Sequence, residues 1–232
     1  MKILSVDSSA KTASVAVTDG ETLLSECFVN AGLTHSRTLM PMVDNALRQA
    51  DLKIEDIDAF CVNAGPGSFT GIRIGVAAVK GLALANGKLC SGISTLEAIA
   101  YNFIDEDAVI CSSMDARCNQ VYAALFRAKD GVINRLCDDY AVPIPELTEK
   151  IAEFGDEKVI LAGDGAELFY NAVKDRFNNI KLSSEFRRYQ RAYGSALAAV
   201  RNNNFDDSSL LAPVYLRMPQ AERELKLKKE NK

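Results

Sequence analysis

A glycine-rich stretch at residues 65–75 reads Gly-Pro-Gly-Ser-Phe-Thr-Gly-Ile-Arg-Ile-Gly. It lies between two apolar runs, and this order predicts a strand, a tight turn and the start of a helix. Gly65 and Gly67 permit positive φ angles and close backbone approach, and Ser68 or Thr70 can cap the helix. Free N–H groups at a helix start attract anions, so the turn is a candidate phosphate site. The alternative is a tight turn before a closely packed helix.

Carboxylates at strand ends and a second glycine turn would complete such a site. A carboxylate beside hydroxyl groups suits a phosphate and its Mg²⁺ ion, although the same residue types also favour ordinary turns. The stretch lacks the Gly-Lys-Ser/Thr of a Walker loop and the Gly-x-Gly-x-x-Gly of a dinucleotide fold. The candidate nucleotide or anion ligands are Asp7, Ser8, Ser9, Gly65, Gly67, Ser68, Asp115, Gly163 and Gly165.

The elements that would position these groups occur twice along the chain. Each half offers a strand ending in Asp, an Asp-Gly hairpin, a helix and a strand that runs into a glycine turn. In the first half we expect strands at 3–6, 13–18, 23–29, 57–64 and 89–93, and helices at 36–50, 72–86 and 95–103. In the second half we expect strands at 109–115, 121–126, 132–142 and 159–162, and a helix at 145–154.

This repetition predicts an α/β protein built from two β-β-β-α-β-α lobes with a cleft between them. The expected ranges are 1–104 for the first lobe, 105–219 for the second and 220–232 for a charged, mobile tail. Lys226, Lys228 and Lys229 in that tail are candidates for weak RNA contacts in an assembly.

Composition narrows the possible functions. The net charge of −4 disfavours a free-standing nucleic-acid binder, because phosphate contacts need clustered Lys and Arg. The single histidine, His35, and the absence of Cys-x-x-Cys disfavour a zinc site, and the six cysteines are typical of buried thiols in a reducing compartment. No apolar run reaches the length of a membrane span, so we expect a cytoplasmic protein without membrane contact.

Four motifs together resemble the TsaB family, also called YeaZ. They are Ile-Leu-Ser-Val-Asp-Ser-Ser at residues 3–9, the glycine stretch at 65–75, Asp-Ala-Arg at 115–117 and Pro-Val-Tyr-Leu-Arg at 213–217. The resemblance implies an actin/Hsp70-like ATPase fold of the RNase H-like type. It also implies an accessory role in making threonylcarbamoyladenosine in tRNA, as a non-catalytic partner that binds and activates the catalytic subunit TsaD.

The resemblance further implies the ATPase TsaE as a third member, a homodimer when TsaD is absent, and tRNA contact only through the complex. Family members dock through helices of the first lobe, which carries over to Leu39, Met42, Val43, Ala46, Ile74, Ala78 and Leu82. A charge introduced at Val43 or Ala78 is then expected to abolish association and leave a folded monomer.

TsaD carries a His-x-x-x-His metal pair after its glycine loop and helix, whereas residues 93–100 here read Ile-Ser-Thr-Leu-Glu-Ala-Ile-Ala. This difference favours a scaffold without catalytic residues, metal site or required cofactor, with ATP or ADP as an optional ligand of the cleft. Two alternatives stay open. One is an active small-molecule kinase or ATPase, and the other is a glycopeptidase-like metallopeptidase.

Overall fold

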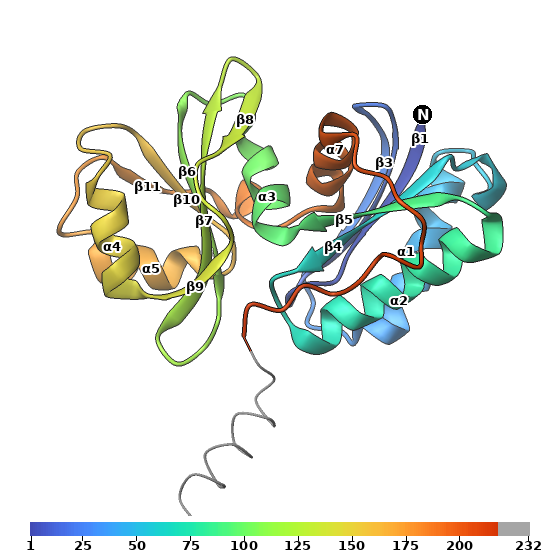
Figure 1. Ribbon diagram of the computed structural model, residues 1–232, viewed down its shortest axis with the longest axis horizontal. Helices are drawn as coiled ribbons and strands as arrows, with labels where there is room; N and C mark the ends of the chain where they lie inside the picture. Colours follow the sequence, from blue (N-terminus) through green and yellow to red (C-terminus); the bar gives the residue numbers. More distant parts are fainter. Residues whose placement is uncertain (218–232) are drawn as a thin grey trace, which may run out of the picture.

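The computed structural model describes residues 1–217, and they form two lobes that lie side by side, each built on one β-sheet (Figure 1). The central strands are buried on both faces, and apolar stripes on the helices pack against them, which assigns each element to one layer. The first half of the chain contains β1 (Lys2–Asp7), β2 (Ala13–Asp19), β3 (Thr22–Val29), α1 (His35–Gln49), β4 (Ala59–Gly65), α2 (Phe69–Asn86), β5 (Leu89–Ser94) and α3 (Thr95–Ala100).

The second half repeats this order with one extra strand, β9, and then adds one helix, α7. Its elements are β6 (Ala108–Asp115), β7 (Gln120–Lys129), β8 (Val132–Arg135), β9 (Tyr140–Pro143), α4 (Ile144–Ala152), β10 (Val159–Ala162), α5 (Ala166–Val173), β11 (Ile180–Leu182), α6 (Glu185–Arg188) and α7 (Ala192–Asn202). The predicted tail at 220–232, with its three lysines, lies outside the described residues.

The two sheets have the same topology, which confirms the predicted duplication. The first sheet runs β3-β2-β1-β4-β5, and the second runs β8-β7-β6-β10-β11. In each, the first three strands are antiparallel neighbours and the last two join the central strand in parallel. The carboxyl ends of the two central strands, β1 and β6, both face the space between the lobes.

The third strand of the second lobe differs from the expectation of one strand at 132–142. The structure has two short strands instead, and both pair with β7. Between them Arg135 donates to Asp139 at 2.6 Å and contacts Glu97 at 3.1 Å. The segment stays against β7, because the N–H of Leu136 donates to the carbonyl of Leu125 at 2.8 Å and the N–H of Leu125 donates to the Sγ of Cys137 at 3.3 Å, but regular strand pairing is interrupted.

Two helices cross between the lobes. Helix α3 packs its residues Leu96 and Ile99 against the second sheet, whereas α7, near the end of the chain, packs Ala196 and Leu197 against β1, β4 and β5 of the first sheet. The helices also contact each other, so they form a shared layer between the sheets (Figure 1). The expected range 105–219 for the second lobe differs from the structure at its end, because α7 and the following residues up to Val214 pack on the first lobe.

The cysteines are free thiols within the lobes. Burial raises the pKa of Cys61 and of Cys111 to about 12, so these thiols are protonated and unreactive at neutral pH. Cys118, in the turn between β6 and β7, is the exposed member of the set. Within residues 1–217 no helix combines the length and apolar character needed to cross a membrane.

Candidate functional site

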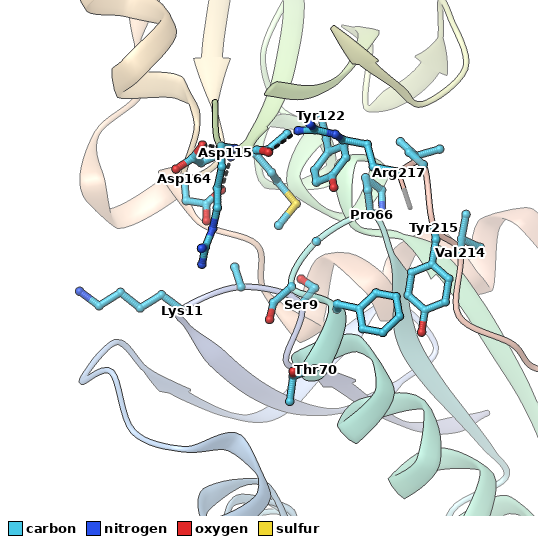
Figure 2. Close-up of a pocket in the computed structure, with 18 residues that line it drawn as sticks. Ser9, Lys11, Pro66, Thr70, Asp115, Tyr122, Asp164, Val214, Tyr215 and Arg217 are labelled. Atoms are coloured by element: carbon cyan, nitrogen blue, oxygen red, sulfur yellow. Dashed lines mark hydrogen bonds between the residues drawn. The ribbon is translucent and has the colours of Figure 1, made fainter. Parts of the chain in front are cut away.

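A cleft of about 580 Å³ opens between the two lobes (Figure 2). Four of the predicted ligands line it, namely Ser9, Gly67, Ser68 and Asp115. The remaining five lie behind its wall, at the strand ends and turns that shape it: Asp7, Ser8, Gly65, Gly163 and Gly165. The structure therefore brings all the predicted residues to one region but exposes fewer than half of them to a ligand.

The first glycine turn packs tightly against the end of β1. A side chain on Gly67 would collide with the carbonyl oxygen of Ser9, and the φ angle of Gly67 is +154°. The N–H of Ser68 donates to that same carbonyl at 2.6 Å. Ser68 caps α2 as predicted, because its hydroxyl accepts from the N–H of Gly71 at 3.3 Å.

The second glycine turn repeats this packing in the other lobe. A side chain on Gly163 would collide with the carbonyl oxygen of Ser113, and one on Gly165 would lie 2.7 Å from the carbonyl carbon of Met114. The N–H of Gly165 donates to Ser113 at 3.1 Å, and the N–H of Gly163 donates to Arg188 at 2.7 Å.

The glycines are therefore needed because each turn packs closely against the end of a strand, where a side chain would collide with backbone. The N–H groups of Ser68, Gly163 and Gly165 already donate to the protein's own carbonyls. A phosphate needs such donors to be free. These three N–H groups are therefore not available to a phosphate, and a phosphate cradle would have to use other N–H donors of the two turns.

Asp7 is fully buried at the end of β1. Its Oδ1 accepts from the hydroxyl of Ser9 at 2.6 Å and from the amide of Asn63 at 2.8 Å, and Asn63 in turn accepts from Ser195 of α7 at 2.7 Å. Its Oδ2 has no hydrogen-bond partner among the described residues. Burial raises the pKa of Asp7, since the hydrogen bonds only partly offset desolvation of the charge.

Asp115 and Asp164 approach each other across the end of the second sheet. The N–H of Asp115 donates to Oδ1 of Asp164 at 3.2 Å. Burial raises the pKa of Asp164 to about 6, and the negative charges of Asp115 and Asp7 act in the same direction. The wall of the cleft is therefore acidic where the two central strands end. Within the described part of the chain, no three acidic, His or Cys side chains are grouped closely enough to hold a metal ion.

This pKa gives a prediction for pH-dependent stability. The pKa of Asp164 is about 6 in the folded chain and near its ordinary 3.8 in the unfolded chain, so the folded state binds the proton more tightly. The free energy of unfolding should therefore fall as the pH rises from about 4 to about 6. Asp164→Asn removes this loss, and we expect the variant to be about 1 to 3 kcal/mol more stable than the natural chain above pH 6.

Urea denaturation at several pH values measures the effect. The two proteins should have equal stability below about pH 4, where both side chains are neutral. Asn keeps an oxygen that can accept from the N–H of Asp115. A stability difference that does not change between pH 4 and pH 7 would show that the charge of Asp164 carries no penalty.

Sequence reasoning missed several polar side chains of the cleft. Lys11 projects from the turn after β1, and Asp164 stands between the two predicted glycines (Figure 2). Arg117 and Arg217 belong to motifs on which the family resemblance rests, but the motifs did not predict that these two side chains line the cleft. Asp164 could have been proposed from its position in the glycine turn. The positions of Lys11 and Arg217 in the cleft depend on contacts between residues that are far apart in the sequence, so no local pattern predicts them.

The predicted docking residues divide into two groups. On α1, Leu39, Met42, Val43 and Ala46 are all buried in the core of the first lobe. They cannot contact a partner as the structure stands, so the prediction for α1 is wrong for these four side chains. On α2, Ile74, Ala78 and Leu82 are partly buried and border the surface. The sequence pattern could not separate these groups, because an apolar stripe at helical spacing is the same for core and interface.

The topology and the cleft define a two-lobed protein of the actin-like ATPase fold. Residues 30–224 match the family model described as "TsaD: tRNA N6-adenosine threonylcarbamoyltransferase". The Bacillus subtilis protein named tRNA threonylcarbamoyladenosine biosynthesis protein TsaB is 29% identical over 96% of each chain. The Escherichia coli protein of that name is 31% identical over 68% of this chain and 70% of its own length.

The chain belongs to the TsaB (YeaZ) family, within the wider group that the TsaD family model describes. Among solved structures, YeaZ from Pseudomonas aeruginosa superposes with a TM-score of 0.76 at 24% identity, covering 93% of this chain and 99% of that one. Component A of (R)-2-hydroxyglutaryl-CoA dehydratase from Acidaminococcus fermentans superposes with a TM-score of 0.50 at 11% identity, covering 87% and 98%. These two likenesses concern the fold alone.

Proposed function

We propose that this chain is an accessory subunit in the biosynthesis of threonylcarbamoyladenosine in tRNA, and that it binds and activates a TsaD-type catalytic subunit. Its family membership supports the pathway, because the relatives in Bacillus subtilis and Escherichia coli are named for it. The observation that carries the docking role is the surface of α2, described next.

Helix α2 presents small and apolar side chains to solvent. Ala77, Gly81 and Ala85 are exposed along it, and Leu84 is 77% exposed. A helix surface of small residues lets a second helix approach closely, and an exposed leucine gains free energy when a partner covers it. We propose that this surface, together with the partly buried Ile74, Ala78 and Leu82, packs against a helix of the catalytic subunit.

The test is reconstitution of tRNA modification from purified subunits. We expect this chain alone to give no modified tRNA, and the complete set with TsaD and TsaE to give product. Product formed by TsaD and TsaE without this chain would contradict the proposed function. Because the net charge is −4, we expect tRNA to bind the assembled complex and not the isolated chain.

A point variant tests the docking surface. Ala77→Arg places an unpaired charge at the proposed contact, so we expect about a hundredfold weaker binding to TsaD and a matching loss of modification at limiting concentration. Ala77 is preferred to Ala78, because Ala77 is exposed and its replacement leaves the core intact. Calorimetry with TsaD measures the affinity.

The matched control is Ala152→Arg, an exposed alanine at the end of α4 in the other lobe. It should bind TsaD with the natural affinity. Without TsaD, we propose that the same α2 surface forms a homodimer. Light scattering should then show a dimer for the natural chain and a monomer for Ala77→Arg. Equal affinity of the two arginine variants would place the docking surface elsewhere.

An active kinase or ATPase is the second candidate, and one observation favours it. Asp164 lines the cleft, and its raised pKa reflects burial and the nearby negative charges of Asp115 and Asp7, which Mg²⁺ carried by ATP or ADP would offset. Steady ATP turnover by the isolated chain, lost in Asp7→Asn, would support this candidate. Calorimetry with MgADP that detects no heat of binding would contradict it.

A further inference from the structure

The motif at residues 213–217 plays no part in the proposed docking. It ends a segment, residues 206–217, which we call the strap. The strap leaves the end of α7 and crosses the first lobe toward the cleft (Figure 1). Its start is fixed to the sheet edge, because Asp206 and Cys90 exchange two backbone hydrogen bonds of 2.9 Å. Its middle is fixed to α2 through Leu211, which is buried and whose carbonyl accepts from Lys80 at 3.0 Å.

The end of the strap rests on the first glycine turn. The N–H of Val214 donates to the carbonyl of Ala64 at 2.7 Å, and a side chain on Gly65 would collide with the carbonyl oxygen of Val214. The ring of Tyr215 stacks on Phe69 with centroids 4.4 Å apart. The Nε of Arg73 donates to the hydroxyl of Tyr215 at 2.8 Å. The glycine motif and the Pro-Val-Tyr-Leu-Arg motif are therefore two halves of one contact.

Arg217 then crosses from the strap to the second lobe. Its Nη1 donates to the carbonyl of Ala116 at 2.5 Å, in the turn that follows Asp115 (Figure 2). Ala10 and Met114, which both line the cleft, also belong to one apolar cluster that bridges the lobes, and further hydrogen bonds between the halves of the described chain lie near α3 and α7. Arg201 donates to the carbonyl of Gly131 at 2.6 Å, and Ser94 donates to Asp139 at 2.5 Å.

We propose that the strap sets the separation of the two lobes at the mouth of the cleft, and that Arg217 is its releasable end. The lobes are joined at the far side by helices, so the mouth is where their separation can change. Tyr215 is held by stacking, by a hydrogen bond and by the neighbouring Val214, whereas Arg217, within residues 1–217, is held by one hydrogen bond to a carbonyl. Arg217 therefore detaches first, and Tyr215 stays on α2.

Hydrogen exchange measured by mass spectrometry on the full chain tests this order. Arg217→Ala should speed exchange about tenfold in peptides covering 113–120 and 211–217, as expected when one charge-assisted hydrogen bond is lost. Exchange in a peptide covering 64–73 should stay unchanged. Tyr215→Leu removes the anchor itself, so it should speed exchange in 64–73 as well.

The control is Arg176→Ala, because Arg176 makes a bidentate pair with Glu149 inside the second lobe. It should leave all three peptides unchanged. Small-angle scattering gives an independent measure, and Arg217→Ala should increase the radius of gyration while the control does not. Scattering and exchange that both match the natural chain would overturn the proposal. Faster hydrogen exchange to the same degree in every peptide of the Arg217→Ala variant would also overturn the proposal, because Arg217 would then contribute to the global stability of the chain.

Discussion

Val43→Glu is expected to unfold the chain and not to release a folded monomer. Val43 is 4% exposed in the core between α1 and the first sheet, where it packs in a cluster of apolar side chains. A carboxylate placed there loses its hydration without gaining a partner, and we expect the free energy of unfolding to fall by about 4 kcal/mol or more. This is a large part of the stability of an ordinary domain, which is about 5 to 15 kcal/mol.

Circular dichroism in increasing urea measures the loss. The matched control is Met40→Glu on the same helix, because Met40 is 45% exposed. It should change stability by less than about 0.5 kcal/mol. If Val43→Glu kept its natural stability and lost only its partner, then α1 would have to move away from the sheet in the natural chain.

Gly163→Ala is expected to cost about 3 kcal/mol or more, because two penalties act at this position. The φ angle of Gly163 is +96°, a conformation that side chains rarely adopt. A Cβ atom would also lie 2.8 Å from the carbonyl carbon of Ser113 and collide with its oxygen, and backbone at a strand end cannot move aside.

Two other glycines separate the penalties. Gly131 has a φ of +72° with open space around it, so Gly131→Ala should cost only about 1 kcal/mol from strain. Gly81 is helical with open space, so Gly81→Ala should be neutral or stabilise the chain by up to about 1 kcal/mol. Equal losses at Gly163 and Gly131 would show that the turn yields to a Cβ atom.

The local pattern was sufficient to predict most of the duplicated fold. Strands β1, β2, β4 and β6 are short apolar runs bounded by polar turns, and their burial on both faces gives the strongest sequence signal. Ser68 predicted the start of α2, because its hydroxyl can accept from the N–H of a residue three positions later, and that residue is Gly71. Such features depend only on neighbours in the chain.

Features that depend on distant residues were not predicted. Helix α7 and strand β11 lie in a stretch without a clear apolar stripe, and α7 is held by the first sheet, far away in sequence. The glycine turns show the same limit. Their composition permits close approach, but only the folded chain determines whether an anion or the carbonyl of Ser9 receives the N–H of Ser68.

The crossing of α3 and α7 between the lobes has a consequence for synthesis of the chain. While the ribosome has released only the residues up to about α3, one face of the first sheet, including Ile3 and Cys61, still lacks the helix that covers it. That helix is α7, which emerges after the whole second sheet. The first lobe therefore completes its fold after the second sheet has emerged, and the nascent protein must keep an apolar surface from aggregating until α7 has been synthesised.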